Sequence, residues 1–168
     1  MAKKVLITGV LGGIGSGLAV AFREEGFHVY GVDILADNQN NCDQFFQFDL
    51  NQFVSSEAYR NEWIQFFQKN ISELDVLINN AAVQILGSLG DVQLSEWQET
   101  LNVNLTGPML LSQVFLKPLE KSKGCIINIG SIHQQLTKPN FVSYATSKSA
   151  LIGLTKACLL YTSDAADE

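Results

Sequence analysis

The sequence predicts an α/β protein whose parallel sheet is doubly wound, with helices on both faces. Short apolar segments of strand length alternate with longer segments of helical periodicity, as expected for right-handed crossovers between parallel strands. A glycine-rich turn also joins the first strand to the first helix. The predicted strands cover residues 4–8, 27–33, 45–49, 74–80 and 124–130, and the predicted helices cover residues 14–25, 55–69, 95–120 and 143–157.

The turn after the first strand is suited to an anion. Its glycines allow the backbone to approach a ligand closely, and the free N–H groups and dipole of the following helix attract negative charge. The pyrophosphate of a dinucleotide fits this arrangement, although glycines at such a turn also serve close packing of helix on strand. The residues expected to cradle the ligand are Thr8, Gly9, Gly13, Ile14 and Gly15.

The second strand ends in Asp33, where a dinucleotide-binding sheet presents an acid to the adenosine ribose. An aspartate there accepts hydrogen bonds from both ribose hydroxyls and repels a 2′-phosphate. No Arg or Lys lies in residues 9–15 or 33–48, so we expect NAD to be preferred over NADP. The alternative is an aspartate that only caps a helix or shapes a loop.

The remaining segments indicate core packing and one irregular helix. Ser95 is expected to cap the helix over residues 95–120, which Gly107 and Pro108 should interrupt. Residues 38–41 indicate an exposed loop. Aromatic residues at helical spacing are expected in the core, and these are Phe22, Trp63, Phe66, Phe67 and Trp97.

The final predicted helix carries Tyr144 and Lys148, four residues apart and therefore on one face. An ammonium beside a phenol favours the phenolate, so such a tyrosine can exchange a proton with an alcohol near neutral pH. An isolated pair of this kind is commonly accidental. Ser131 precedes the pair, and the glycine turn and Asp33 accompany it, which favours a catalytic interpretation.

Six motifs follow one another along residues 1–157. They are, in order, Thr8-Gly9-x-x-x-Gly13-x-Gly15, Asp49-Leu50, Asn79-Asn80-Ala81-Ala82, Asn104-Leu105-Thr106-Gly107, Ser131 and Tyr144-x-x-x-Lys148. With these motifs the chain resembles the short-chain dehydrogenase/reductases over residues 1–157. The extra Gly12 also permits the glycine spacing of the extended branch of that family, but the segments that begin at Asn79 and Asn104 match the ordinary branch.

The resemblance implies a catalytic tetrad. Tyr144 would be the general acid/base, and Lys148 would assist it while holding the nicotinamide ribose. Ser131 would hydrogen-bond the reacting oxygen, and Asn104 would hold a water that relays protons. The resemblance also places Asp49, Leu50, Asn80 and Ala81 on the cofactor, alongside the turn residues and Asp33.

Two details extend this expectation. Pro108 follows Asn104 by four residues and lacks an N–H. One interpretation is that it frees the Asn104 carbonyl for that water; the alternative is that the Gly107-Pro108 pair simply kinks the helix for packing. His133 lies two positions past Ser131, in a loop that resembles the loop of sugar and 3-hydroxyacid dehydrogenases in the family, and we expect it to face the substrate pocket. The alternative for His133 is a solvated loop side chain.

The composition is typical of an α/β enzyme that acts on small molecules. The 168 residues carry a formal charge of −6, which disfavours nucleic acid and anionic membranes as partners. No apolar run has the length of a membrane span and no signal peptide is evident, so we expect a cytoplasmic protein. The odd count of three cysteines, without C-x-x-C spacing, indicates neither a disulfide framework nor a metal site.

Residues 158–168 resemble an in-frame translation of a sequencing-library adapter, the alternative being a natural acidic terminus. We expect residues 1–157 to form one NAD-binding and catalytic domain of Rossmann type, incomplete on its C-terminal side. The expected function is NAD-dependent interconversion of a secondary alcohol and a carbonyl, on a small sugar, polyol or hydroxyacid, by a homo-oligomer when full-length. The alternatives are a non-catalytic dinucleotide-binding regulatory protein and an inactive fragment.

Overall fold

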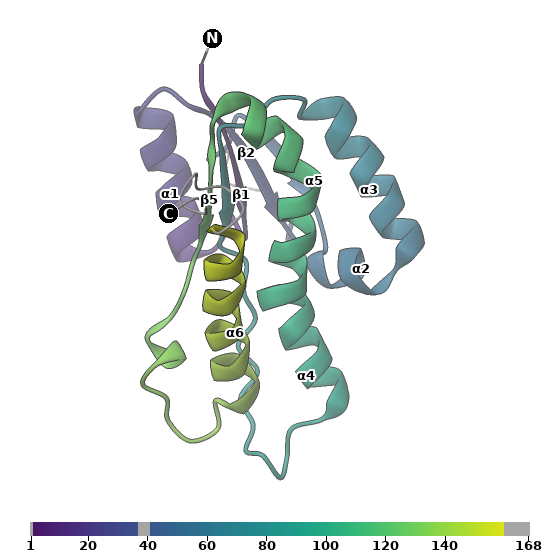
Figure 1. Cartoon of the computed structure of the whole chain (residues 1–168), viewed down its shortest axis with the longest axis vertical. Helices are drawn as coiled ribbons and strands as arrows, with labels where there is room; N and C mark the ends of the chain where they lie inside the picture. The colour runs from purple at the N-terminus through teal and green to yellow at the C-terminus, as the bar shows by residue number, and fades with distance from the viewer. Residues whose placement is uncertain (1, 37–40, 160–168) are drawn as a thin grey trace, which may run out of the picture.

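A computed structural model describes residues 2–36 and 41–159 as a five-stranded parallel sheet with helices on both faces (Figure 1). The strand order is β3-β2-β1-β4-β5, which confirms the predicted doubly wound fold. Of the exposed loop predicted over residues 38–41, residues 38–40 lie outside the described residues, as do residues 160–168 of the tail. The strands are β1 (Lys4–Thr8), β2 (His28–Asp33), β3 (Gln44–Gln47), β4 (Val76–Asn79) and β5 (Cys125–Asn128).

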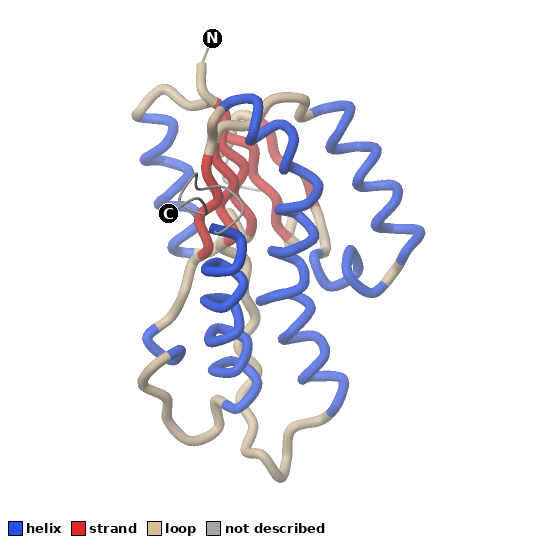
Figure 2. Tube along the Cα trace, in the orientation of Figure 1, coloured by secondary structure: helices blue, strands red, loops and turns tan. Residues whose placement is uncertain are grey.

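The helices follow the predicted alternation, as the coloured trace in Figure 2 shows. The α6 helix includes Cys158 and Leu159, so the first two residues of the tail continue the last helix. The helical elements are α1 (Gly13–Glu24), α2 (Leu50–Ser55), α3 (Glu57–Asn70), α4 (Leu94–Leu101), the π-helical turn η1 (Asn102–Thr106), α5 (Gly107–Ser122), the 3-10 turn η2 (Ile132–Gln134) and α6 (Val142–Leu159).

Alternating side chains of the central strands pack into two separate hydrophobic cores, one on each face of the sheet. Leu6 of β1 packs in a core with residues of α3 and α5, whereas Val5 and Ile7 pack in a second core with residues of α1. Because both faces are covered, the central strands are apolar at nearly every position. As predicted, Phe67 is buried in the first core, and Trp63 and Phe66 pack against it. Phe22 packs against the second core. Trp97 belongs to neither core.

The sheet order places a crevice at the end of β1. The chain leaves β1 toward β2 on one side, and β4 pairs with β1 on the other. Such a reversal of strand order opens a space beyond the carboxyl ends of the strands, where ligands of open α/β sheets bind. The loops that follow Thr8, at the end of β1, and Asn79, at the end of β4, therefore both lie at this crevice.

Two predicted helix starts differ from the structure. The helix expected from residue 55 begins at Glu57, because a separate short helix, α2, precedes it and is capped by the Asp49 side chain, which accepts the Gln52 N–H at 3.0 Å. Ser95 is not the cap of α4, which begins at Leu94 after Gln93. The Gln93 N–H is satisfied instead by the Glu96 carboxylate at 3.0 Å.

The expected interruption of the long helix lies just before Gly107, in the π-helical turn, rather than at Gly107 and Pro108 themselves. Gly107 belongs to this site for steric reasons, because a Cβ there would lie 2.6 Å from Leu50 Cγ. Close packing against Leu50 thus explains the glycine at this position. Whether the Asn104 carbonyl holds a water stays a prediction.

No helix within residues 2–36 and 41–159 has the length and apolar character needed to cross a lipid bilayer. At the side of the sheet opposite β3, the described strands end with β5, whose Cys125 and Ile127 are exposed. A groove of about 560 Å³ runs beside β5, between α5 and the end of α6. The edge of β5 thus offers unpaired N–H and C=O groups.

We expect the 168-residue chain, expressed alone, to be largely insoluble or partly unfolded, because β5 can pair with other chains. Ile127→Lys, at a position that is 39% exposed, should raise the soluble fraction by placing a charge on the edge. Val20→Lys adds the same charge on α1, at a 44% exposed position, and should not. The measurement is the soluble fraction after lysis with size-exclusion chromatography, and a monodisperse unmodified chain would contradict the prediction.

Candidate functional site

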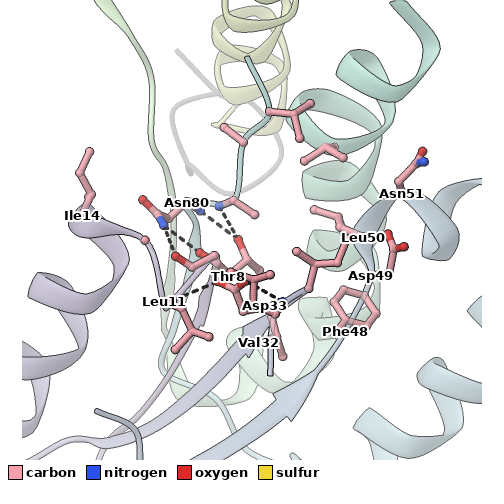
Figure 3. A pocket seen from close by; sticks show the side chains of 18 of the residues that line it. Thr8, Leu11, Ile14, Val32, Asp33, Phe48, Asp49, Leu50, Asn51 and Asn80 are labelled. Atoms are coloured by element: carbon pink, nitrogen blue, oxygen red, sulfur yellow. Dashed lines mark hydrogen bonds between the residues drawn. The ribbon is translucent and has the colours of Figure 1, made fainter. Parts of the chain in front are cut away.

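A cavity of about 560 Å³ lies beyond the carboxyl ends of β1, β2 and β4 (Figure 3). Nine of the ten residues expected to bind only the cofactor line it, and Gly15 is the exception. The lining also includes residues that sequence reasoning did not single out, among them Asn51, Val83 and Glu99. The nine are Thr8, Gly9, Gly13, Ile14, Asp33, Asp49, Leu50, Asn80 and Ala81.

The glycine turn passes so close to the loop after β4 that side chains are excluded. Gly9 has φ +63°, and a Cβ there would lie 2.8 Å from the Ala81 Cα. A Cβ on Gly15 would collide with the Gly9 carbonyl and lie 2.8 Å from the Val10 Cα. Gly15 therefore packs directly against the backbone of the turn. Gly13, at the start of α1, faces open space instead. This leaves room for an anion at the N-terminus of the helix.

Thr8 and Asn80 hold the two loops together. The Thr8 hydroxyl oxygen accepts the backbone N–H groups of Asn80 at 3.0 Å and Ala81 at 2.9 Å. In return the Asn80 side-chain amide donates to the carbonyls of Thr8 at 2.9 Å and Gly9 at 3.0 Å. The amide donors of Asn80 thus fix the glycine turn.

Asp33 is fixed at the rim of the cavity by two backbone groups. One carboxylate oxygen accepts the Leu11 N–H at 3.0 Å and the other accepts the Leu35 N–H at 3.1 Å. Each oxygen retains a lone pair for a further donor such as a hydroxyl. Asp49 and Glu99 also line the cavity, and its described lining contains no Lys, Arg or His.

These features fit a dinucleotide. The open backbone at Gly13 suits a pyrophosphate, and Asp33 presents acceptors at the end of the second strand, where a ribose would lie. Within the described ranges no group of three or more His, Cys, Asp or Glu side chains is placed to hold a metal ion.

The predicted catalytic residues do not line this cavity but gather around the first turns of α6. Lys148 is 2% exposed, and its ammonium donates to the Ile129 carbonyl at 2.7 Å and lies 5.9 Å from the centre of the Tyr144 ring. Burial away from water lowers the pKa of Lys148 below its ordinary value. The distance between the Lys148 ammonium and the Tyr144 ring agrees with the prediction that both side chains lie on one face of α6.

Ser131 lies at the start of the turn η2, between β5 and α6. Its hydroxyl oxygen accepts the His133 N–H at 3.2 Å. The His133 ring stacks on Phe141 at 4.2 Å and meets Tyr144 edge-on at 6.0 Å. Among the described side chains, no hydrogen bond joins Ser131 to Tyr144 or Lys148, so they share a region without direct contact.

Asn104 connects α6 to the cavity. It is 1% exposed, and its amide both accepts the Val83 N–H and donates to the Val83 carbonyl, each at 2.9 Å. It also donates to the Ser147 hydroxyl at 3.0 Å. Sequence reasoning missed Val83 and Ser147, and only the position of Ser147 between Tyr144 and Lys148 could have drawn attention to it.

Comparison with known proteins shows the family of the chain. A family model described as short chain dehydrogenase matches residues 3–163. The chain belongs to this family. The D-xylose 1-dehydrogenase of Caulobacter vibrioides is 33% identical to it over 162 residues, covering 92% of this chain and 64% of that protein. Dehydrogenase/reductase SDR family member 6 of Aquarana catesbeiana is 31% identical over 157 residues, covering 92% of this chain and 63% of that protein.

Among solved structures, the short-chain dehydrogenase chain resembles a 4-hydroxyisoleucine dehydrogenase complexed with NADH, at 34% identity and a TM-score of 0.80. The match covers 95% of this chain and 69% of that one. The chain thus spans less than two thirds of the length of the two curated relatives above. For the experiments below, we define the extended protein as residues 1–157 of this chain continued to the full length of these relatives.

The glycine turn of this short-chain dehydrogenase can be tested with two glycines of α1. Gly15→Ala should lower the free energy of unfolding of the extended protein by about 3 kcal/mol, because the new Cβ meets backbone. Gly17→Ala, where no atom lies within 4 Å, should raise it by about 0.5–1 kcal/mol. Urea unfolding followed by circular dichroism measures both, and equal effects of the two substitutions would contradict the steric argument.

Proposed function

We propose that the chain is the cofactor-binding and catalytic part, over residues 1–157, of an NAD-dependent oxidoreductase that interconverts a secondary alcohol and a carbonyl. The observation that carries the proposal is the pairing of Tyr144 with the buried Lys148 on one face of α6, beside a cavity suited to a dinucleotide. Bound there, the nicotinamide group supplies the hydride acceptor or donor.

In this proposal the proton is handled by α6. The Tyr144 phenolate oxygen would take the proton from the alcohol oxygen in oxidation, and the hydroxyl formed in this way would return it to the carbonyl oxygen in reduction. The Lys148 ammonium, 5.9 Å from the centre of the Tyr144 ring, would favour the phenolate by charge attraction. Its bond to the Ile129 carbonyl uses one of three donor positions, which leaves two for a ribose hydroxyl or a water at Asn104.

The substrate is proposed to be a small polar alcohol, such as a sugar, a polyol or a hydroxyacid. The Ser131 hydroxyl would bind the reacting oxygen, and the His133 ring, which meets Tyr144 edge-on, would border the substrate. The Nδ1 atom of His133 is buried without a hydrogen-bond partner within the described part of the chain. The name of the xylose dehydrogenase relative supports a polar substrate.

The extended protein is proposed to form a homo-oligomer through the α4–α5 segment and α6. Leu94 of α4 and Leu116 of α5 are 70% and 43% exposed and so would be available to such a contact. The 168-residue chain by itself is proposed to be inactive, because β5 ends the described sheet with an exposed edge that can pair with other chains.

Removing the phenol oxygen tests the chemistry. In the extended protein, Tyr144→Phe should lower kcat by about two to four decades, because only the proton-transferring group is lost. NADH affinity, measured by fluorescence titration, should survive. Lys148→Met should damage both turnover and affinity, because the lysine serves both. Full turnover by Tyr144→Phe would contradict the role of Tyr144 and favour a cofactor-binding regulatory protein.

Cofactor preference tests Asp33. The extended protein should bind NADH at least about ten-fold more tightly than NADPH, the equivalent of about 1.4 kcal/mol of charge repulsion. Asp33→Ala with Ile34→Arg should move the preference toward NADPH, because Ile34 lines the cavity and is 59% exposed. Asp33→Ala with Ile34→Gln is the uncharged control. Equal or tighter binding of NADPH by the unmodified protein would refute the assignment of Asp33.

A further inference from the structure

A buried hydroxyl joins Asn104 to the backbone beneath the catalytic tyrosine. Ser147 is fully buried, and its hydroxyl donates to the Tyr144 carbonyl at 2.7 Å while accepting the Asn104 amide at 3.0 Å. Both roles of the hydroxyl are therefore assigned, and its proton direction is fixed by the carbonyl, which cannot donate. A hydrogen bond between two buried groups of this kind orients both, because neither has water as a substitute partner.

The same asparagine reaches the cofactor cavity. Asn104 holds both the N–H and the carbonyl of Val83, which lines the cavity. An unbroken series of hydrogen bonds thus runs from Val83 through Asn104 and Ser147 to Tyr144. It joins three segments that are far apart in sequence: the loop after β4, the π-helical turn and the first turn of α6.

Neighbouring hydroxyls do not share this arrangement. Thr146 is exposed, and its hydroxyl donates to the Val142 carbonyl at 2.8 Å. That bond is local to α6. Ser147 differs because its hydroxyl also accepts from another element, so its loss would release Asn104 and not only a turn of the helix.

We propose that Ser147 is a positioning residue, which through Asn104 sets the place of Tyr144 and Lys148 relative to the cofactor cavity. The inference rests on the proposed function of Tyr144. Ser147 itself touches neither substrate nor cofactor. Without its hydroxyl, one Asn104 N–H is left buried without an acceptor, and the asparagine can turn away from Val83.

An isosteric pair of substitutions isolates the hydroxyl. Ser147→Thr keeps the oxygen and Ser147→Val replaces it with a methyl of similar size, so any crowding by the extra carbon is common to both. In the extended protein, kcat of Ser147→Val should be about 10- to 100-fold below that of Ser147→Thr, the loss typical of a displaced catalytic group. NADH affinity should differ by less than about three-fold, because Thr8, Gly9 and Asp33 are untouched.

The pH dependence of kcat separates positioning from a general loss of stability. If Ser147 places Tyr144 against Lys148, the pH midpoint of kcat should shift in Ser147→Val and stay at the original value in Ser147→Thr. Thr146→Val is the matched control, because it removes a hydroxyl from the adjacent position without touching Asn104. It should leave both kcat and its pH midpoint unchanged.

A second measurement does not depend on activity. Amide hydrogen exchange of Val83 reports the bond from its N–H to Asn104 directly. It should be at least about ten-fold faster in Ser147→Val than in Ser147→Thr, and unchanged in Thr146→Val. If the extra methyl prevents folding, Ser147→Ala is compared with the unmodified protein by the same exchange measurement.

The outcomes separate the two proposals. No turnover by the unmodified extended protein would refute the proposed function, whereas accelerated Val83 exchange would still support the connection through Ser147. Equal kcat, equal pH midpoint and equal Val83 exchange in Ser147→Val and Ser147→Thr would overturn the inference. Equal effects of Ser147→Val and Thr146→Val would also overturn it, since the loss would then belong to the helix in general.

Discussion

The close passage of the turn after β1 over the loop after β4 is the constraint on which the site depends. Gly9 and Gly15 have no room for a side chain, and the bonds between Thr8 and Asn80 hold the two loops at that distance. The same contact opens the N-terminus of α1 to a ligand and sets the course of the chain toward Val83. A cofactor cavity and the anchor for Asn104 thus follow from one backbone crossing.

The placement of α6 relies on hydrogen bonds more than on apolar packing. Of its buried residues only Leu151 is apolar, the others being Ser143, Ser147 and Lys148. Two asparagines reach the helix from the body of the protein: Asn104 at Ser147 and Asn128 at Thr155, where the amide donates to the hydroxyl at 2.9 Å. Directional bonds fix a helix in rotation and along its axis, whereas an apolar stripe tolerates small shifts. A helix that carries reacting groups benefits from the former.

The predictions from sequence succeeded where the signal is local. Alternating apolar segments located all five strands, and the spacing of Tyr144 and Lys148 gave their common face. The short helix α2 was missed because its start depends on the Asp49 side chain, a residue that family resemblance had assigned to the cofactor. The contacts of Ser147 and Asn104 join residues 43 positions apart, and no local pattern records such a pairing.

The central position of β1 also governs how the chain can fold. One neighbour, β2, follows soon after, but Val5 pairs with Val76 of β4 on the other side. Strand β1 must therefore wait for a partner about seventy residues downstream before both of its edges are paired. Pairings between distant segments close large loops and slow folding. Until β4 has been synthesised, one edge of β1 therefore has no native partner, although β2 and α1 are already present in the chain.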